Sequence, residues 1–318
     1  MERCTFPSAG APLNCAVSGG ADSLALLVLG VAAGCEVTAW HVDHGLRPAS
    51  SGEADVVGAA AERFGAQFRA VTARVEPGPN LEARARAARR AVLPEDVATG
   101  HTADDQAETV LLNLLRGSAL DGLAGMRAGP AHPVLALRRW ETHKLCAELG
   151  LVPVVDPTND DQRHRRNSLR HTLMPLLDEI AERDVARLIS RQAHLLAADA
   201  DLLEALAAQL DPTDANALAA APLPLARRAV RRWLRPALSG RPPGEAAVAR
   251  VLAVARGESS ATDVAEGVRV QRRQGCLKIE TATTFPGGPI DPPSCVTPPV
   301  PSATPCAGAT PGRRGITE

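Results

Sequence analysis

The chain has 318 residues, 45% of them hydrophobic and 22% charged, which is the composition of a soluble globular protein of about two domains. Its net charge of -1 argues against a uniformly basic nucleic-acid coat but leaves room for local patches. The seven cysteines are scattered without a CxxC pair, so neither a disulfide framework nor a thiolate metal site is indicated. No apolar signal core or membrane-length apolar run is present, and we therefore expect a cytoplasmic protein without membrane attachment.

The first hundred residues alternate short apolar runs with longer Ala-rich stretches, which predicts βαβ units and a parallel sheet. The predicted strands are 14–17, 36–41, 67–71 and 96–99, and the predicted helices are 22–33, 51–64 and 81–92. Right-handed crossovers place all strand C-termini along one edge of such a sheet, where ligands bind.

The next part of the chain predicts a helix over 103–116, a strand and a helix within 134–149, and a helix beginning near Arg166. The pattern then changes to helices over 184–210, 227–238 and 245–256 and a hairpin over 268–279 with Gly275 near its turn. The leucines of the long helix, among them Leu188, Leu195, Leu202 and Leu206, are expected to form its buried stripe.

We therefore predict an α/β fold in which a parallel-sheet domain is followed by a smaller, mostly helical domain and a tail. The expected boundaries are 1–182, 183–284 and 285–318. The tail is rich in Pro and Gly and has no apolar period, so we expect it to be disordered.

A glycine-rich loop, SGGADS, connects the first predicted strand to the first helix. Its members are Ser18, Gly19, Gly20, Ala21, Asp22 and Ser23. Glycines let backbone N–H groups approach an anion and the helix dipole favours negative charge, so the loop predicts a phosphate site. Asp22 fits such a site when a magnesium ion lies between its carboxylate and the phosphates. The alternative is a plain turn in which Asp22 only complements the helix dipole.

Polar residues also follow the second predicted strand, in HVDHGLR. His41, Asp43, His44 and Arg47 would lie at the sheet edge beside the glycine-rich loop. A polar strand-end loop without a ligand is the alternative interpretation.

A third string, GHTADDQAET, carries three acids within five residues: Asp104, Asp105 and Glu108. On a helix, Asp105 and Glu108 share a face with His101, and this carboxylate cluster could bind a metal or a cationic substrate. The alternative is a capping box of Thr102 and Asp105 with acids that favour the helix N-terminus.

The string AVSGGADS resembles the PP-loop of the N-type ATP pyrophosphatases, which split ATP into AMP and pyrophosphate. Together with HVDHGLR, GHTADDQAETVLLNLLRGS and DPTNDDQRHRRNSLR, it resembles the ordered motifs of the tRNA(Ile)-lysidine synthetase family. This resemblance covers about residues 13 to 180 and continues more weakly to about residue 280. One departure is His132-Pro133, where the family usually has Arg-Pro.

The resemblance implies an activity, its substrates and its site. Members of the family use ATP to join free L-lysine to C2 of the wobble cytidine of tRNA(Ile) with a CAU anticodon, through an adenylylated cytidine. The product, lysidine, changes the codon read from AUG to AUA, and AMP and pyrophosphate are released. The implied ATP-binding residues are Ser18 to Ser23, with Asp22 on magnesium. The implied catalytic candidates are Asp43, Asp104, Asp105 and Glu108.

We expect arginines to provide the tRNA contacts, because arginine pairs well with phosphate. Arg166 and Arg170 lie in the fourth motif, and Arg228 and Arg232 lie on a predicted helix within 216–244, a stretch without Asp or Glu. The lack of acids favours a phosphate-binding face, and the alternative is a solvated charged face.

Two rival functions stay open from the sequence. A tRNA 2-thiocytidine synthetase is also a PP-loop enzyme, but it uses CxxC cysteines that this chain lacks. A non-catalytic module that binds ATP or tRNA is the second rival, and the intact acids and Asp22 argue against it.

Overall fold

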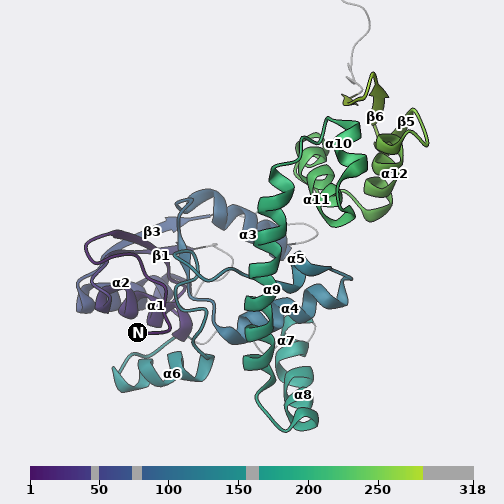
Figure 1. Cartoon of the computed structure of the whole chain (residues 1–318). Helices are drawn as coiled ribbons and strands as arrows, with labels where there is room; N and C mark the ends of the chain where they lie inside the picture. The colour runs from purple at the N-terminus through teal and green to yellow at the C-terminus, as the bar shows by residue number, and fades with distance from the viewer. Residues whose placement is uncertain (44–49, 74–80, 155–164, 282–318) are drawn as a thin grey trace, which may run out of the picture.

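The structure is a computed structural model that describes residues 1–43, 50–73, 81–154 and 165–281. A sheet with its helices forms one body, and a smaller body built mainly of helices lies at the far end of a long helix, α9 (Figure 1). The expected tail lies outside the described residues.

The first body contains a four-stranded parallel sheet with the order β3-β2-β1-β4. Its strands are β1 (Pro12–Ala16), β2 (Glu36–Asp43), β3 (Gln67–Thr72) and β4 (Ala98–Thr99). The chain moves outward from β1 to β3 and then returns to the other side of β1. The ends of β1 and β4 therefore form a topological switch point, where open α/β sheets bind ligands.

Helices connect and flank these strands. They are α1 (Ala21–Ala32), α2 (Ser50–Phe64), α3 (Leu81–Val92), α4 (Ala103–Leu115), α5 (Leu120–Leu123) and α6 (Arg139–Glu148). All strands and helices predicted for the first hundred residues are present, although β4 has only two residues.

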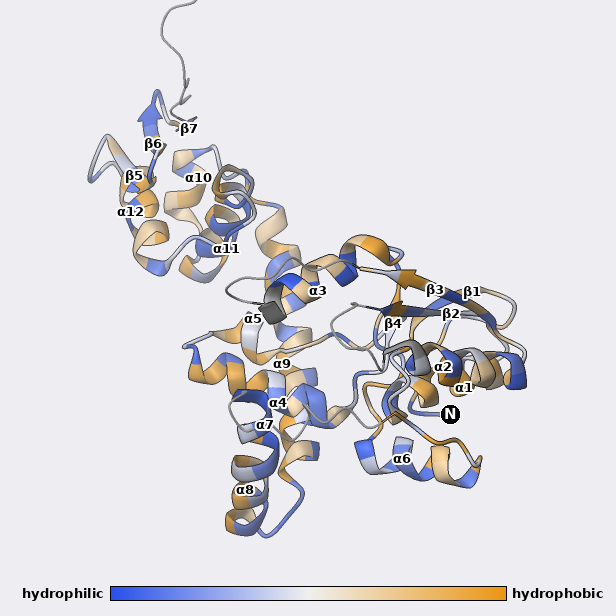
Figure 2. Ribbon diagram, turned by 180° about the vertical axis from the view of Figure 1, so that it is seen from behind, coloured by the Kyte–Doolittle hydropathy of each residue, from blue (hydrophilic) through white to orange (hydrophobic). Residues whose placement is uncertain are grey.

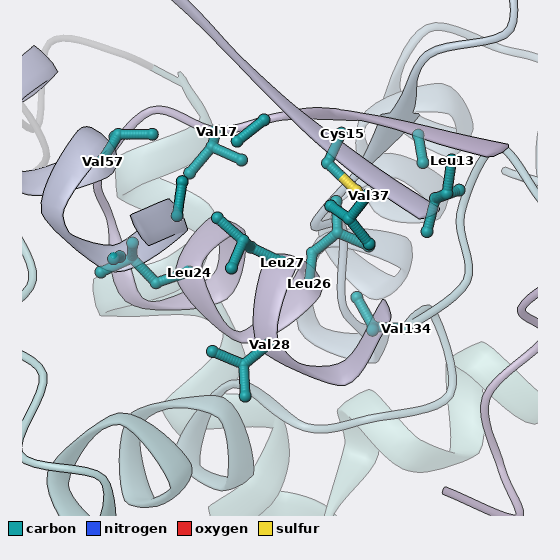
Figure 3. Close-up of a cluster of buried hydrophobic side chains, with 14 of the residues drawn as sticks. Leu13, Cys15, Val17, Leu24, Leu26, Leu27, Val28, Val37, Val57 and Val134 are labelled. Atoms are coloured by element: carbon teal, nitrogen blue, oxygen red, sulfur yellow. The ribbon is translucent and has the colours of Figure 1, made fainter. Parts of the chain in front are cut away.

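Small aliphatic side chains and Cys15 fill the interior between β1 and α1. Leu13, Cys15 and Val17 from the first strand segment pack with Leu24 and Leu27 from α1 (Figure 3). All five are buried. Because aromatics make up only 2% of the chain, this core depends on close packing of Val, Leu and Ala, and it fixes the start of α1 against the end of β1.

The segment after α6 leads into the long helix. It contains α7 (Arg165–Ser168), a π-helical turn (Leu169–Leu173), α8 (Met174–Ala181) and α9 (Val185–Ala208). The last of these packs against α4 and α5 of the first body and against α11 (Leu223–Leu234) of the second. It is therefore the physical connection between them (Figure 1).

The predicted buried stripe of α9 is wrong in part. Leu188, Leu195, Leu202 and Leu206 are exposed, while alanines face the neighbouring helices. The buried alanines are Ala186, Ala193, Ala197, Ala200 and Ala207. Small side chains allow helices to approach closely, so alanines can form a buried helix face. The prediction followed the spacing of the larger leucines instead.

The second body combines helices with a three-stranded antiparallel sheet of order β5-β6-β7. Its elements besides α11 are α10 (Ala215–Ala220), a 3-10 turn (Pro236–Leu238), α12 (Glu245–Arg256), β5 (Ala261–Ala265), β6 (Val268–Arg273) and β7 (Cys276–Thr281). The predicted hairpin is confirmed, and Gln274 and Gly275 form its turn at positive φ angles of 50° and 80°. β5 and α10 were not predicted from the sequence.

The strand expected at the start of 134–149 is absent from this described segment. Val134 and Leu137 are buried, but they lie in successive turns, and the N–H of Leu137 bonds the carbonyl of Val134. A short apolar run fits a buried turn as well as a strand, so the pattern did not separate the two. Across the described part of the chain, no helix has the length and apolar content needed to cross a membrane.

Candidate active site

The SGGADS loop lies at the switch point, between the end of β1 and the start of α1. Gly19 has a φ of +87°, and a Cβ atom there would lie 2.9 Å from Cγ2 of Val154. Gly20 is the N-cap residue of α1 and has an extended conformation. Both the backbone angle and the close contact at Gly19 therefore require glycine.

The backbone donors of this loop are left open. The N–H groups of Gly19, Gly20, Ala21 and Asp22 donate no hydrogen bond to any acceptor in the described ranges. Four successive open donors at a helix N-terminus are suited to bind an anion.

Two serines hold the loop in shape. The Ser18 N–H donates to Ser23 Oγ at 3.1 Å, and Ser23 Oγ donates to the Gly20 carbonyl at 2.8 Å. Ser23 is buried and has a structural role, whereas Ser18 is exposed beside the open donors. Ser18 is thus the hydroxyl that a ligand can reach.

Asp22 is held by two side chains from α6. Its carboxylate accepts a hydrogen bond from Thr142 Oγ1, and Arg139 Nε lies 3.4 Å from its second oxygen. Burial raises the pKa of Asp22, although Thr142 and Arg139 act in the opposite direction. Asp22 therefore lies at the boundary between the open loop and a network of charged groups.

Asp22 was predicted to hold magnesium, and the side chains around it show which metal ligands are available. The described residues contain no group of three or more His, Cys, Asp or Glu side chains placed to hold a metal. Magnesium usually binds proteins through one or two carboxylates and takes its other ligands from phosphates and water. A single carboxylate at the mouth of a phosphate loop fits that mode.

The predicted acidic residues lie together on α4, and arginines neutralise them. Glu108 has a side chain only 2% exposed, and it meets Arg139 at 3.2 Å and Arg166 and Arg170 at 2.8 Å each. Glu108 is therefore the centre of a buried ion-pair network.

Asp104 and Asp105 are also fully engaged. Asp104 accepts from Arg138 Nη2 at 2.8 Å and from the N–H of Arg139 at 2.7 Å. Asp105 accepts from the Thr102 N–H and from Arg139 Nη2, both at 2.9 Å. Burial favours a higher pKa for both acids, but these partners outweigh it and lower the pKa of each. Both carboxylates are therefore ionised at neutral pH.

The capping-box interpretation of this string is confirmed, because Thr102 and Asp105 cap α4 reciprocally. The acids also contact Arg138 and Arg139, which the sequence analysis did not consider. These two arginines begin α6, where the helix dipole disfavours positive charge. Two adjacent arginines within 134–149, where a helix was predicted without a stated start, were the available signal that acids lie nearby.

Asp43 lies at the C-terminal end of β2, one strand from the loop, and it is partly buried. His41, two residues before it, is 2% exposed, and its Nδ1 lies 3.0 Å from the carbonyl oxygen of Val17. His41 therefore supports the residue that leads into the loop. His44 and Arg47 lie outside the described residues.

Two histidines share one hydroxyl at the end of β4. Thr99 Oγ1 lies 2.7 Å from His101 Nδ1 and 2.8 Å from His132 Nδ1. Burial lowers the pKa of His101 to about 4 and also lowers the pKa of His132. Both rings are therefore neutral at neutral pH, and His132 fills the position where the resembling family usually has arginine.

The arginine face of α11 has acidic partners, so the expectation that it lacks them is wrong. Arg228 pairs with Asp121 at 2.6 Å and with Glu204 at 3.2 Å. Arg232 pairs with the same Glu204 at 2.9 Å. These acids come from α5 and α9, which the local sequence around α11 does not reveal.

Family models match both bodies of the chain. A PP-loop domain matches residues 5–177, and a TilS substrate binding domain matches residues 213–277. The first match covers the open loop and the acid–arginine network, and the second covers the smaller body.

Relatives of known name match most of the chain. It is 43% identical over 245 residues to a tRNA(Ile)-lysidine synthase of Nocardia farcinica, which covers 72% of this chain and 77% of that protein. It is 39% identical over 270 residues to a tRNA(Ile)-lysidine synthase of Gloeobacter violaceus, with 76% and 82% covered. A solved U34-tRNA thiolase, NcsA from Methanococcus maripaludis, has 18% identity and a TM-score of 0.48, with 60% of this chain and 73% of that chain covered. Because both family models match and the two synthases are similar over most of the chain, the chain belongs to the tRNA(Ile)-lysidine synthase family.

Proposed function

We propose that the chain uses ATP to ligate free L-lysine to C2 of the wobble cytidine of tRNA(Ile) with a CAU anticodon. The product is lysidine, and the codon read by the tRNA changes from AUG to AUA. The observation that carries the proposal is the loop from Ser18 to Ser23, whose open N–H donors lie at the switch point of the sheet. Membership in the synthase family supports the choice of substrates.

The first step activates the cytidine. Its O2 attacks the α-phosphorus of ATP, a new P–O bond forms, and the bond from this phosphorus to pyrophosphate breaks. Negative charge grows on the departing pyrophosphate, where the N–H groups of Gly19, Gly20, Ala21 and Asp22 can donate to it. Because Ser23 already fixes the loop, these donors need little rearrangement in the transition state.

Magnesium, when bound, would supply positive charge against the phosphates of ATP. Asp22 is the residue that would hold it, since it is the carboxylate of the loop itself. The hydrogen bond from Thr142 keeps the Asp22 side chain in place at the mouth of the loop.

The second step transfers the amine. The ε-nitrogen of lysine attacks C2, the C2–O2 bond breaks, O2 leaves as part of AMP, and the nitrogen gives up a proton. We propose that Asp43, Asp104, Asp105 and Glu108 are the residues that bind the lysine amine groups or receive this proton. The lowered pKa values of Asp104 and Asp105 favour binding of a cation over uptake of a proton.

A cavity beside the acids offers both carboxylates and apolar side chains to a bound lysine. Three acids line it, Asp104, Glu108 and Asp178, together with the apolar Met174 and Pro175 and with Arg138, Arg139 and Arg170. The methylenes of lysine can lie on the apolar side chains while its ammonium group meets a carboxylate.

For the tRNA, we propose contacts from Arg166 and Arg170 near the reaction and from Arg228 and Arg232 on the smaller body. In this division residues 1–182 carry catalysis, residues 183–284 bind tRNA, and residues 285–318 take no part. Because the reaction needs a tRNA substrate, we also propose that it takes place in the cytoplasm.

The test is nucleoside analysis of unmodified tRNA(Ile) after incubation with the full chain, ATP, magnesium and lysine. We expect lysidine to form, with one AMP and one pyrophosphate for each lysidine. A reaction without lysine is the control and should yield no lysidine. Pyrophosphate release that never yields lysidine would instead indicate another tRNA modification by a PP-loop enzyme. If neither pyrophosphate nor lysidine forms, the proposal is overturned.

A further inference from the structure

One helix of the first body carries a cluster of positive charge. Arg86, Arg89 and Arg90 lie on α3 with spacings of three and four residues, which places them on one face of the helix. All three are exposed. The acid–arginine network does not include any of them.

This cluster has no acidic counterpart within the described ranges. Arg86, Arg89 and Arg90 form neither an ion pair nor a side-chain hydrogen bond with any of the side chains that the structure describes. Partial burial of the guanidinium lowers the pKa of Arg89, and the neighbouring charges of Arg86 and Arg90 lower it further. Like charges held together without a partner cost free energy, and a bound anion would remove that cost.

The helix that carries the cluster is followed in the chain by β4, which pairs with β1 at the switch point. Burial lowers the pKa of His101, the residue that follows Gly100 after β4, and the charge of Arg86 lowers it further. In Figures 1 and 2, α3 lies on the side of the sheet body from which the smaller body extends. A ligand that enters the site from this side would pass the arginine face.

We propose that Arg86, Arg89 and Arg90 bind backbone phosphates of the tRNA next to the wobble nucleotide. This inference rests on the proposed function, which brings a cytidine and its flanking phosphates to this edge of the sheet. Guanidinium groups pair with phosphate oxygens through two parallel hydrogen bonds. The three side chains are distributed over about 6 Å of helix axis, which suits an extended polyanion better than a single nucleotide. The ATP phosphates already have the open donors of the loop.

The test removes two of the charges without disturbing the helix. The variant Arg86→Gln/Arg90→Gln keeps side-chain length and helix propensity. The matched control Arg63→Gln/Lys144→Gln removes two exposed positive charges from α2 and α6. Both full-length proteins and the wild type are titrated with unmodified tRNA(Ile) between about 50 mM and about 200 mM salt.

We expect the α3 variant to bind tRNA roughly tenfold more weakly at the middle of this range, and the log–log salt slope to fall by about 0.7–0.9 per lost contact. The loss should be the same for a second tRNA of different sequence, because phosphates carry no sequence information. ATP affinity should not change. The control variant should keep the wild-type slope.

A slope equal to that of the control would overturn the proposal, and so would a loss of ATP affinity without a loss of tRNA affinity. Because binding is measured without turnover, these results are separate from the proposed function. Absence of lysidine with the wild-type chain would count against the function alone.

Discussion

The SGGADS loop and the acid–arginine network lie side by side, but their polar groups differ in whether they have partners. In the loop, four successive backbone N–H groups have no acceptor within the described residues. In the network, every carboxylate of Asp104, Asp105 and Glu108 has an arginine partner. The loop therefore has open donors for a ligand, whereas the carboxylates of the network are already paired with arginines before any ligand binds.

The largest effect should follow from changes in the loop. We expect Ser18→Ala or Asp22→Ala to reduce pyrophosphate release by at least about a hundredfold, the usual cost of losing a donor or charge at a developing anion. Both variants should stay folded, because Ser18 is exposed and Asp22 is only partly buried. Near-wild-type turnover in both variants, with magnesium still required, would remove the loop from the mechanism.

Changes in the network should also lower stability. Glu108→Gln leaves Arg139, Arg166 and Arg170 without their common partner, and breaking a buried pair in this way costs about 3–5 kcal/mol. The measurement is the free energy of unfolding in urea.

The matched control for this variant is Asp201→Asn, which breaks an exposed pair with Arg127. An exposed pair contributes about 1 kcal/mol at most. Equal losses of unfolding free energy in the two variants would contradict the contrast between the regions.

A smaller effect should appear in the pH dependence of stability. The pKa of His101 is about 4 in the folded chain and about 6.5 when unfolded, so the unfolded state binds more protons between these values. The stability is therefore fully present above about pH 6.5 and falls as the pH approaches 4, by up to about 3 kcal/mol. His132 contributes in the same direction.

The variant His101→Gln isolates this contribution. Its unfolding free energy should depend less steeply on pH between about 6.5 and 4 than that of the wild type. Parallel pH profiles for the two proteins would show that His101 is not the group responsible.

Local patterns predicted those parts of the chain whose structure depends on nearby residues. The bounds of α3 and α12 agree with the prediction, and the loop lies between the strand and helix that were expected to flank it. The capping box at Thr102 and Asp105 was also open to prediction, since both partners lie within four residues. In each case one short segment contains the information.

Properties that depend on distant partners were not predictable. The acids of α4 find their arginines on α6 and after residue 164, and Arg228 finds Asp121 far away in the sequence. The buried alanines of α9 depend on which helices pack against it. A single sequence gives the charge of each residue but not the charge that it meets after folding.

Hydrogen exchange of individual amides tests the contrast between the two regions most directly. The account predicts that the amides of Gly19, Gly20, Ala21 and Asp22 exchange rapidly in the free protein and slow by at least about tenfold with saturating ATP and magnesium. The amides of Thr102 and Arg139, which already donate to Asp105 and Asp104, should be slow in both states. Loop amides that are protected without ATP, or that exchange equally fast with it, would contradict the claim that this loop holds the phosphates.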